Sequence, residues 1–166
     1  MNGTEDPIQI SFYAVDWRGS TLSNMTPTPL VFRGVPAACV EAIVQSMNFP
    51  FDDKRHLEVL GEVGPACKSR IYEAEAIVSD TGLVFWDGVS FPVDSDARRS
   101  LLRGVIRAKF ETNKLAWEAL RLSDGRSFEY VTSPLDEVLS VPSLLMMEAL
   151  GELLNDIRTG ALPLPK

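Results

Sequence analysis

The sequence predicts a mainly α-helical fold of the α+β class: a single-domain helical bundle with a small N-terminal β element. Apolar residues recur mostly at spacings of three and four, which is typical of amphipathic helices. Segments that alternate like strands are short and few, so a Rossmann sheet built from βαβ repeats is excluded. The length of 166 residues is that of one ordinary domain, and residues 1–166 are therefore expected to form one domain.

The N-terminal part of the chain is expected to contain the β element. Residues 8–14 alternate loosely and predict a strand, and residues 30–32 predict a second one. The intervening residues 15–29 are rich in Gly, Ser, Thr, Asn and Pro, which predicts a long loop. Because long loops are uncommon in compact domains, this one is a candidate functional segment.

Helices are expected over most of the remaining sequence. Pro36 suits the first position of a helix, and apolar residues follow it at helical spacing. Further helices are predicted over residues 53–60, 65–78, 96–111, 113–122 and 143–158, with a strand over residues 128–132. Asp94 or Asp96 is expected to cap the helix over residues 96–111. The inward face of the last helix is predicted to consist of Leu144, Met147, Leu150, Leu154 and Ile157.

Composition excludes several classes of function. The 16 Lys and Arg against 23 Asp and Glu give a net charge of −7, which argues against broad, charge-driven wrapping of nucleic acid. One histidine, His56, and two cysteines leave few metal ligands, so no metal and no cofactor are expected. The low cysteine count, the polar start and the lack of a long apolar run indicate a cytoplasmic protein without a membrane partner. The common nucleotide-binding, metalloprotease and hydrolase motifs are absent.

Four sequence blocks carry a more specific signal. They are FY at 12–13 with LSN at 22–24 and E-x-x-x-Q-x-x-N-F at 41–49, ACKSR at 66–70, WD at 86–87 with LLRGVIRAKF at 101–110, and L-G-x-x-L-x-x-x-R at 150–158. In their order and spacing these blocks resemble the NADAR family (NAD- and ADP-ribose-associated proteins) over about residues 10–160.

The resemblance implies an N-glycosidase. Known members of the family cleave a base–ribose bond, either in phosphorylated riboflavin-pathway intermediates or in ADP-ribose attached to guanine. The implied activity here is hydrolysis of such a bond in an ADP-ribosyl or ribosyl-phosphate conjugate. The implied partner is a nucleotide or ADP-ribosyl conjugate, either free or carried on an ADP-ribosylated nucleic acid.

Two carboxylates are the implied catalytic residues. Glu41 matches the family's helix glutamate and falls at the edge of an apolar stripe, where a half-buried carboxylate suits acid–base catalysis. The alternative is a solvent-facing glutamate on an amphipathic helix. Asp136 resembles the aspartate of the family's P-x-D-x-x-W-G turn, and it would orient ribose hydroxyls or share the proton transfer. Its alternative role is to cap a helix over residues 137–139.

Six further residues are implied in substrate binding: Tyr13, Asn24, Lys68, Trp86, Lys109 and Glu148. Trp86 would stack on the base or the ribose, or else be a core aromatic residue. Asn24 would bind ribose hydroxyls or a base edge, or else be a turn residue. Lys109 matches the lysine of the family's L-R-A-K-F element, and Glu148 occupies the place of the family's asparagine before L-G.

Three arginines share one face of the helix over residues 96–111, because they follow at spacings of four. Arg99, Arg103 and Arg107 would hold a diphosphate or a nucleic-acid backbone, or else form a charged, solvated face. The sequence leaves both interpretations open.

Departures from the family pattern leave a second function open. Asn48 replaces the family's helix lysine, and Leu139-Ser140 stands where the family has W-G. If that lysine acts directly on the sugar, Lys68 or Lys109 must take its place. The alternative to an enzyme is therefore a catalytically silent module that binds ADP-ribose or a related nucleotide.

Overall fold

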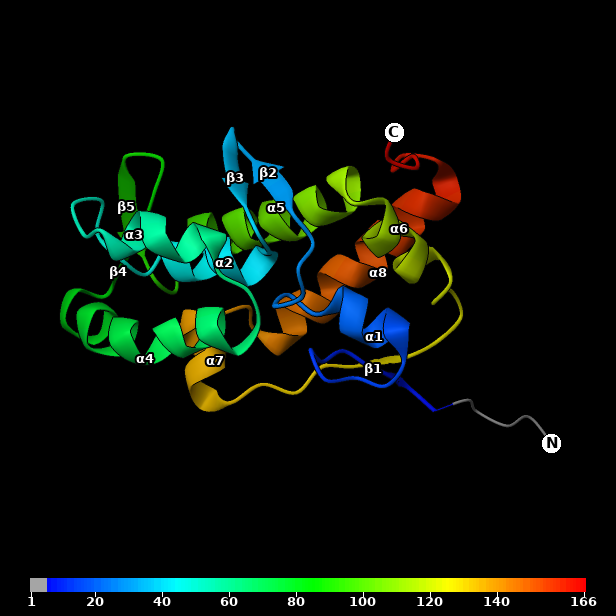
Figure 1. The fold of residues 1–166 in the computed structure, drawn as a ribbon, viewed down its shortest axis with the longest axis horizontal. Coiled ribbons are helices and arrows are strands. Elements are labelled where there is room, and N and C mark those ends of the chain that lie inside the picture. The colour runs from blue at the N-terminus through cyan, green and yellow to red at the C-terminus, as the bar shows by residue number, and fades with distance from the viewer. Residues whose placement is uncertain (1–5) are drawn as a thin grey trace.

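Two long helices, α5 (Asp96–Thr112) and α8 (Ser143–Thr159), form the centre of the fold and pack against each other. The computed structural model describes residues 6–166. At one end of α5 lie α6 (Lys114–Arg121) and α1 (Trp17–Leu22), which contact each other, and at the other end lie α4 (Gly64–Thr81) and α7 (Pro134–Leu139) (Figure 1). The mainly helical α+β class predicted from the sequence is confirmed.

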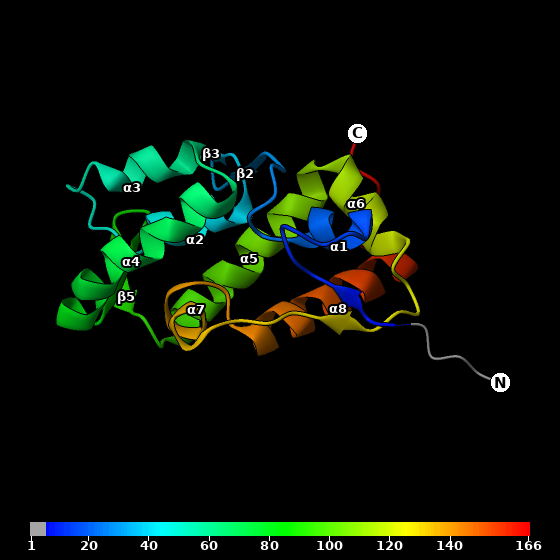
Figure 2. The same cartoon turned by 60° about the horizontal axis from the view of Figure 1, so that its bottom comes forward.

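Within residues 6–166 the strands form three separate pairs. β1 (Ile8–Gln9) pairs in parallel with β6 (Phe128–Glu129), so that two distant parts of the chain lie side by side (Figure 2). β2 (Leu30–Phe32) and β3 (Val35–Ala37) form one antiparallel hairpin, and β4 (Leu83–Trp86) and β5 (Val89–Pro92) form another.

Both hairpins turn through a non-glycine residue followed by glycine, each with a positive φ. These pairs are Arg33-Gly34, with φ of 49° and 81°, and Asp87-Gly88, with φ of 51° and 74°. Two positive φ angles in a two-residue loop give the turn whose twist matches that of antiparallel strands. The two-residue turn thus fixes the register of each hairpin.

The buried helix α2 (Val40–Ser46) carries Glu41. All seven of its residues are buried, and it packs against α4, α5, α3 (Arg55–Glu58) and the short 3-10 helix η1 (Val59–Gly61). A helix enclosed on every side cannot present a solvent-facing glutamate. The interpretation of Glu41 as a solvated residue of an amphipathic helix is therefore wrong.

The predicted loop over residues 15–29 is wrong in part, because it contains α1. Asp16 caps this helix by accepting a hydrogen bond from the Arg18 backbone at 2.9 Å. Gly19 is required inside it, since a Cβ there would lie 2.0 Å from the carbonyl oxygen of Gln9. The Gly- and Ser-rich composition that predicted a loop instead allows α1 to approach the neighbouring backbone closely. The predicted strand over residues 8–14 is limited to Ile8–Gln9.

Other boundaries also differ from the prediction. Pro36 does not begin a helix but lies in β3, and α2 begins after Cys39. The helix α5 is capped by Ser95, whose hydroxyl accepts from the Arg98 backbone, rather than by Asp94 or Asp96. The hairpin β4–β5 was not predicted, because its polar turn and short strands give little alternation.

The set of residues that α8 buries in the core differs in part from the predicted set. Leu150 and Leu154 are buried as expected, but Leu144 is 70% exposed, and its neighbours Leu145 and Met146 are buried instead. The helix ends at Gly160, which adopts a left-handed conformation with φ of 80°. Within residues 6–166, none of the helices combines the length and the apolar character needed to span a bilayer.

Candidate active site

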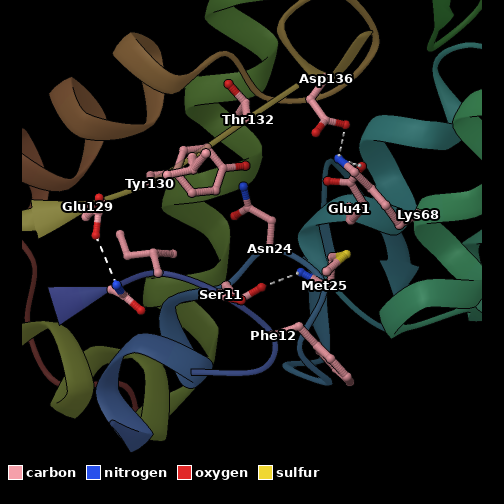
Figure 3. A pocket seen from close by; sticks show the side chains of 14 residues that line it. Ser11, Phe12, Asn24, Met25, Glu41, Lys68, Glu129, Tyr130, Thr132 and Asp136 are labelled. Carbon is pink, nitrogen blue, oxygen red and sulfur yellow. Dashed lines mark hydrogen bonds and ion pairs between the residues drawn. The ribbon is translucent and has the colours of Figure 1, made fainter. Parts of the chain in front are cut away.

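A pocket of about 370 Å³ lies where α2, α4 and α7 meet the chain around β1 and β6. It is lined by Gln9, Ile10, Ser11, Phe12, Ser23, Asn24, Met25, Glu41, Lys68, Glu129, Tyr130, Val131, Thr132 and Asp136. Figure 3 shows Glu41, Lys68 and Asp136 together on one side of it, Tyr130 on the other side, and Asn24 between them. The fold thus brings together four predicted site residues that are far apart in the sequence.

Glu41 lies in the first turn of α2 and has only 1% of its surface exposed. The hydroxyl of Ser140 lies 2.9 Å from both carboxylate oxygens and donates to them. Gln45 Nε2 donates to Oε1 at 2.8 Å, and Lys68 Nζ donates to the same oxygen at 3.3 Å. The Glu41 backbone N–H donates to the carbonyl of Asn24 at 2.9 Å. The carboxylate is therefore held in one orientation, and the loop after α1 is tied to the start of α2.

The ammonium group of Lys68 lies between two carboxylates. Its Nζ is 2.7 Å from Asp136 Oδ1 and 3.3 Å from Glu41 Oε1. Burial acts to lower the pKa of Lys68, but the two carboxylates outweigh it and raise that pKa above its usual value. Burial acts to raise the pKa of Asp136, but the hydrogen bonds from Lys68 and Ser133 outweigh it and lower that pKa. Lys68 and Asp136 are therefore both charged at neutral pH.

Asp136 does not cap a helix over residues 137–139, because it lies inside α7, but it takes part in the capping box of that helix and lines the pocket as well. Its backbone N–H donates to Ser133 Oγ, and its Oδ2 accepts from the Ser133 backbone at 3.1 Å, which together form a capping box at the start of α7. The other oxygen, Oδ1, accepts from Lys68. The capping box and the ion pair with Lys68 therefore use different carboxylate oxygens of Asp136.

Asn24 and Tyr130 supply the uncharged polar groups. Asn24 is 3% exposed, and its Oδ1 has no hydrogen-bond partner within the part of the chain that the structure describes, residues 6–166. Its amide lies beside the hydroxyl of Tyr130 (Figure 3). Burial raises the pKa of Tyr130, the nearby charge of Glu41 raises it further, and the Asn24 amide acts in the opposite direction. Tyr130 is thus a neutral hydroxyl at physiological pH.

The C-terminal end of α7 is fixed by side chains from α2, from the turn that follows α2, and from α5. The carbonyl of Leu139 accepts from Gln45 Nε2 at 3.1 Å and from Asn48 Nδ2 at 2.8 Å. The carbonyl of Ser140 accepts from the buried guanidinium of Arg98 at 2.9 Å. The last carbonyls of a helix lack partners within it, and here buried donors satisfy them. These bonds hold the Ser140 hydroxyl in place against Glu41.

Two of the departures from the family pattern, Asn48 and Leu139-Ser140, therefore contact each other. Asn48 does not line the pocket; it is fully buried, and its amide holds the backbone of Leu139. Ser140 holds Glu41. The lysine that lines the pocket is Lys68, one of the two substitutes considered from the sequence.

Removing the Ser140 hydroxyl is expected to destabilise the protein. Ser140→Ala leaves a buried carboxylate without a donor that contacts both of its oxygens, and a hydrogen bond to a charged group contributes about 1.5–3 kcal/mol. Urea denaturation at neutral pH should show a loss of that size. Ser100→Ala, on the exposed face of α5, is the matched control and should change stability little. Equal stabilities for the two variants would contradict the proposed role of Ser140.

Four of the predicted substrate-binding residues do not line the pocket. Tyr13 is exposed beside Phe12, which does line it. Trp86 is a buried aromatic residue that packs on Phe32 and lines a second, smaller cavity of about 180 Å³. Lys109 is fully buried, and Glu148 pairs with Arg103 at 2.5 Å on the surface.

Lys109 does not line the pocket but holds the backbone of the segment that carries Asn24. Its Nζ donates to the carbonyl of Thr21 at 2.6 Å and to that of Ser23 at 2.9 Å, directly before Asn24. Burial lowers the pKa of Lys109 to about 7.

The arginine face of α5 is engaged by carboxylates. Arg99 pairs with Asp96, and Arg103 pairs with Glu148 and Glu152 of α8. Arg107 pairs with Glu111 and Asp156. These contacts match the solvated interpretation of the stripe. Among residues 6–166, no three His, Cys, Asp or Glu side chains converge as a metal site would require.

Sequence reasoning missed the supports of the site. Arg98, Gln45 and Tyr130 were not singled out for the roles they have, and Ser140 was noted only as a departure from the family pattern. An arginine among the apolar residues of α5, spaced to face inward, was the one available signal for Arg98.

No family model matches the sequence, and no curated protein sequence matches it either. Among solved structures, the NMR structure of the E. coli protein YbiA, a NADAR-family protein, matches with a TM-score of 0.62. The match covers 95% of this chain and 89% of that one, at 16% sequence identity. This chain has the fold of YbiA. At such low identity the likeness shows the fold alone.

Proposed function

We propose that this protein is a divergent member of the NADAR family and an N-glycosidase. Its substrate would be an ADP-ribosyl or ribosyl-phosphate conjugate, free or carried on nucleic acid, and it would cleave the base–ribose bond. The observation that carries the proposal is the cluster of buried Glu41 with the partly buried Lys68 and Asp136 at the wall of one pocket. The shared fold with YbiA supports it independently of the cluster.

The cluster suits the charges that develop when a base–ribose bond breaks. The anomeric carbon becomes cationic, and Glu41 would stabilise that charge or accept a proton from the attacking water. The departing base becomes anionic, and the Lys68 ammonium would stabilise it without changing its own protonation. Asp136 is ionised and would accept hydrogen bonds from ribose hydroxyls. Neither carboxylate has to be reoriented, because both are already held by hydrogen bonds.

The second candidate is a silent module that binds ADP-ribose or a related nucleotide in the same pocket. Two observations favour it: Lys68 is engaged by both carboxylates, and Asn48 holds backbone where the family has a lysine. A lysine paired in this way is a poor nucleophile toward a sugar, because its raised pKa keeps it protonated.

ADP-ribose is expected to raise the melting temperature. A ligand that binds only the folded state at ten times its dissociation constant stabilises a protein by about 1.4 kcal/mol, which is about 3–6 °C for a chain of this size. Differential scanning fluorimetry with millimolar ADP-ribose measures the shift. No shift would count against both the enzyme and the silent module.

Chromatography that detects release of the free base from an ADP-ribosyl conjugate then distinguishes the N-glycosidase from the silent module. Cleavage by the wild-type protein supports the N-glycosidase. A thermal shift without cleavage of any ribosyl conjugate supports the silent module.

A further inference from the structure

The pocket contains more negative than positive charge. Four of its lining residues carry a charge: the carboxylates of Glu41, Asp136 and Glu129, and the ammonium of Lys68. The one ammonium already pairs with two of the carboxylates. The third, Glu129, is exposed and accepts a hydrogen bond from Gln9, so its charge has no cationic partner in the lining. A phosphate entering this space would meet uncompensated negative charge.

The usual phosphate ligands are absent from the lining. Phosphate is typically held by arginine forks, by free lysines or by the free N–H groups of a helix N-terminus. None of the 14 lining residues is an arginine. Arg98 lies nearby, but its guanidinium donates to the Ser140 carbonyl from within the core. At the start of α2, the Glu41 N–H donates to the Asn24 carbonyl.

The pocket instead offers acceptors to a ligand that donates hydrogen bonds. Asn24 Oδ1 is buried and without a partner among residues 6–166, and a buried amide oxygen left unpaired costs about 1–3 kcal/mol. Glu41 Oε2 accepts from Ser140, whereas Oε1 also accepts from Gln45 and Lys68. Ribose hydroxyls and base N–H groups are uncharged donors that suit such acceptors.

We infer that the pocket takes an uncharged nucleoside moiety, a ribose with its base, and that phosphate groups of the substrate stay outside it. This inference rests on the proposed function and narrows the substrate class. Recognition then depends on the sugar and base, and a 5′-phosphate weakens binding. Glu129, at the exposed edge of the pocket, is the residue that discriminates against phosphate.

Adenosine, AMP and ADP-ribose are suitable probes, with affinities measured by calorimetry and by thermal shift at low ionic strength. Because one uncompensated carboxylate repels the phosphate, AMP is expected to bind about 3–10-fold more weakly than adenosine, and added salt should narrow the difference. AMP binding as tightly as adenosine, or more tightly, would overturn the inference and leave the proposed function standing. Absence of binding by all three ligands would overturn both.

The variant Glu129→Gln tests the source of the discrimination. It should strengthen AMP binding by about 2–5-fold and leave adenosine binding nearly unchanged, since only the charge is removed. Glu152→Gln, which removes an exposed carboxylate of α8 outside the pocket, is the matched control and should change neither affinity. A ratio of AMP to adenosine affinity that Glu129→Gln leaves unchanged would overturn the inference.

Discussion

Replacing Glu41 by glutamine is expected to lower turnover by at least about 100-fold, because a positioned acid–base group contributes on the order of 10²–10⁴-fold. The substitution keeps the shape of the side chain and removes its charge and its ability to accept a proton. Ligand affinity should change far less, since Asn24, Tyr130 and Asp136 remain in the pocket. Base release under saturating substrate measures turnover, and calorimetry measures affinity.

The matched control is Glu75→Gln, the same change on the exposed face of α4. Thermal unfolding of both variants is needed as well, because a glutamine at position 41 brings an NH₂ group close to three donors, those of Ser140, Gln45 and Lys68. Wild-type turnover in Glu41→Gln would contradict the catalytic assignment. Loss of folding in that variant would assign Glu41 a structural role.

The sequence was sufficient to predict the helical class, and four of the residues that it singled out line the pocket. Helical spacing located α5 and α8 to within a residue or two, because long amphipathic helices repeat their pattern over several turns. Glu41 and Asp136 were found through the resemblance to the family, which also pointed to Asn24 and Lys68. The pocket that contains these four residues could not be predicted, because it depends on contacts between distant segments.

The errors share a physical cause, which is tertiary contact overriding a local pattern. Trp86 matches a family position, yet its ring packs on Phe32 and lines another cavity. Glu148 is four residues from Glu152, and this spacing lets both reach Arg103. Pro36 is compatible with a helix start, but also with an exposed position in a two-stranded hairpin, where its missing N–H is tolerated.

A further expected result concerns Lys109, whose substitution by methionine should change how stability depends on pH. Burial lowers the pKa of Lys109 to about 7, whereas an unfolded lysine titrates near 10.4. Between these two values the unfolded chain binds a proton that the folded protein has released, so stability rises with pH in that window. When the pH rises from 7 to 9.5, the titration of Lys109 increases the free energy of unfolding by roughly 3 kcal/mol.

Lys109→Met removes the titrating group and keeps a side chain of similar length, but it leaves the carbonyls of Thr21 and Ser23 without their donor. The wild-type protein should therefore gain roughly 3 kcal/mol of stability relative to the variant when the pH rises from 7 to 9.5. Urea denaturation at both pH values measures the difference, and Lys114→Met, at the exposed start of α6, controls for other titrating groups. A wild-type protein and a Lys109→Met variant with the same pH dependence would show that Lys109 keeps its charge in the folded state. The hydrogen bonds from Lys109 to the carbonyls of Thr21 and Ser23 would then be donated by a buried ammonium group.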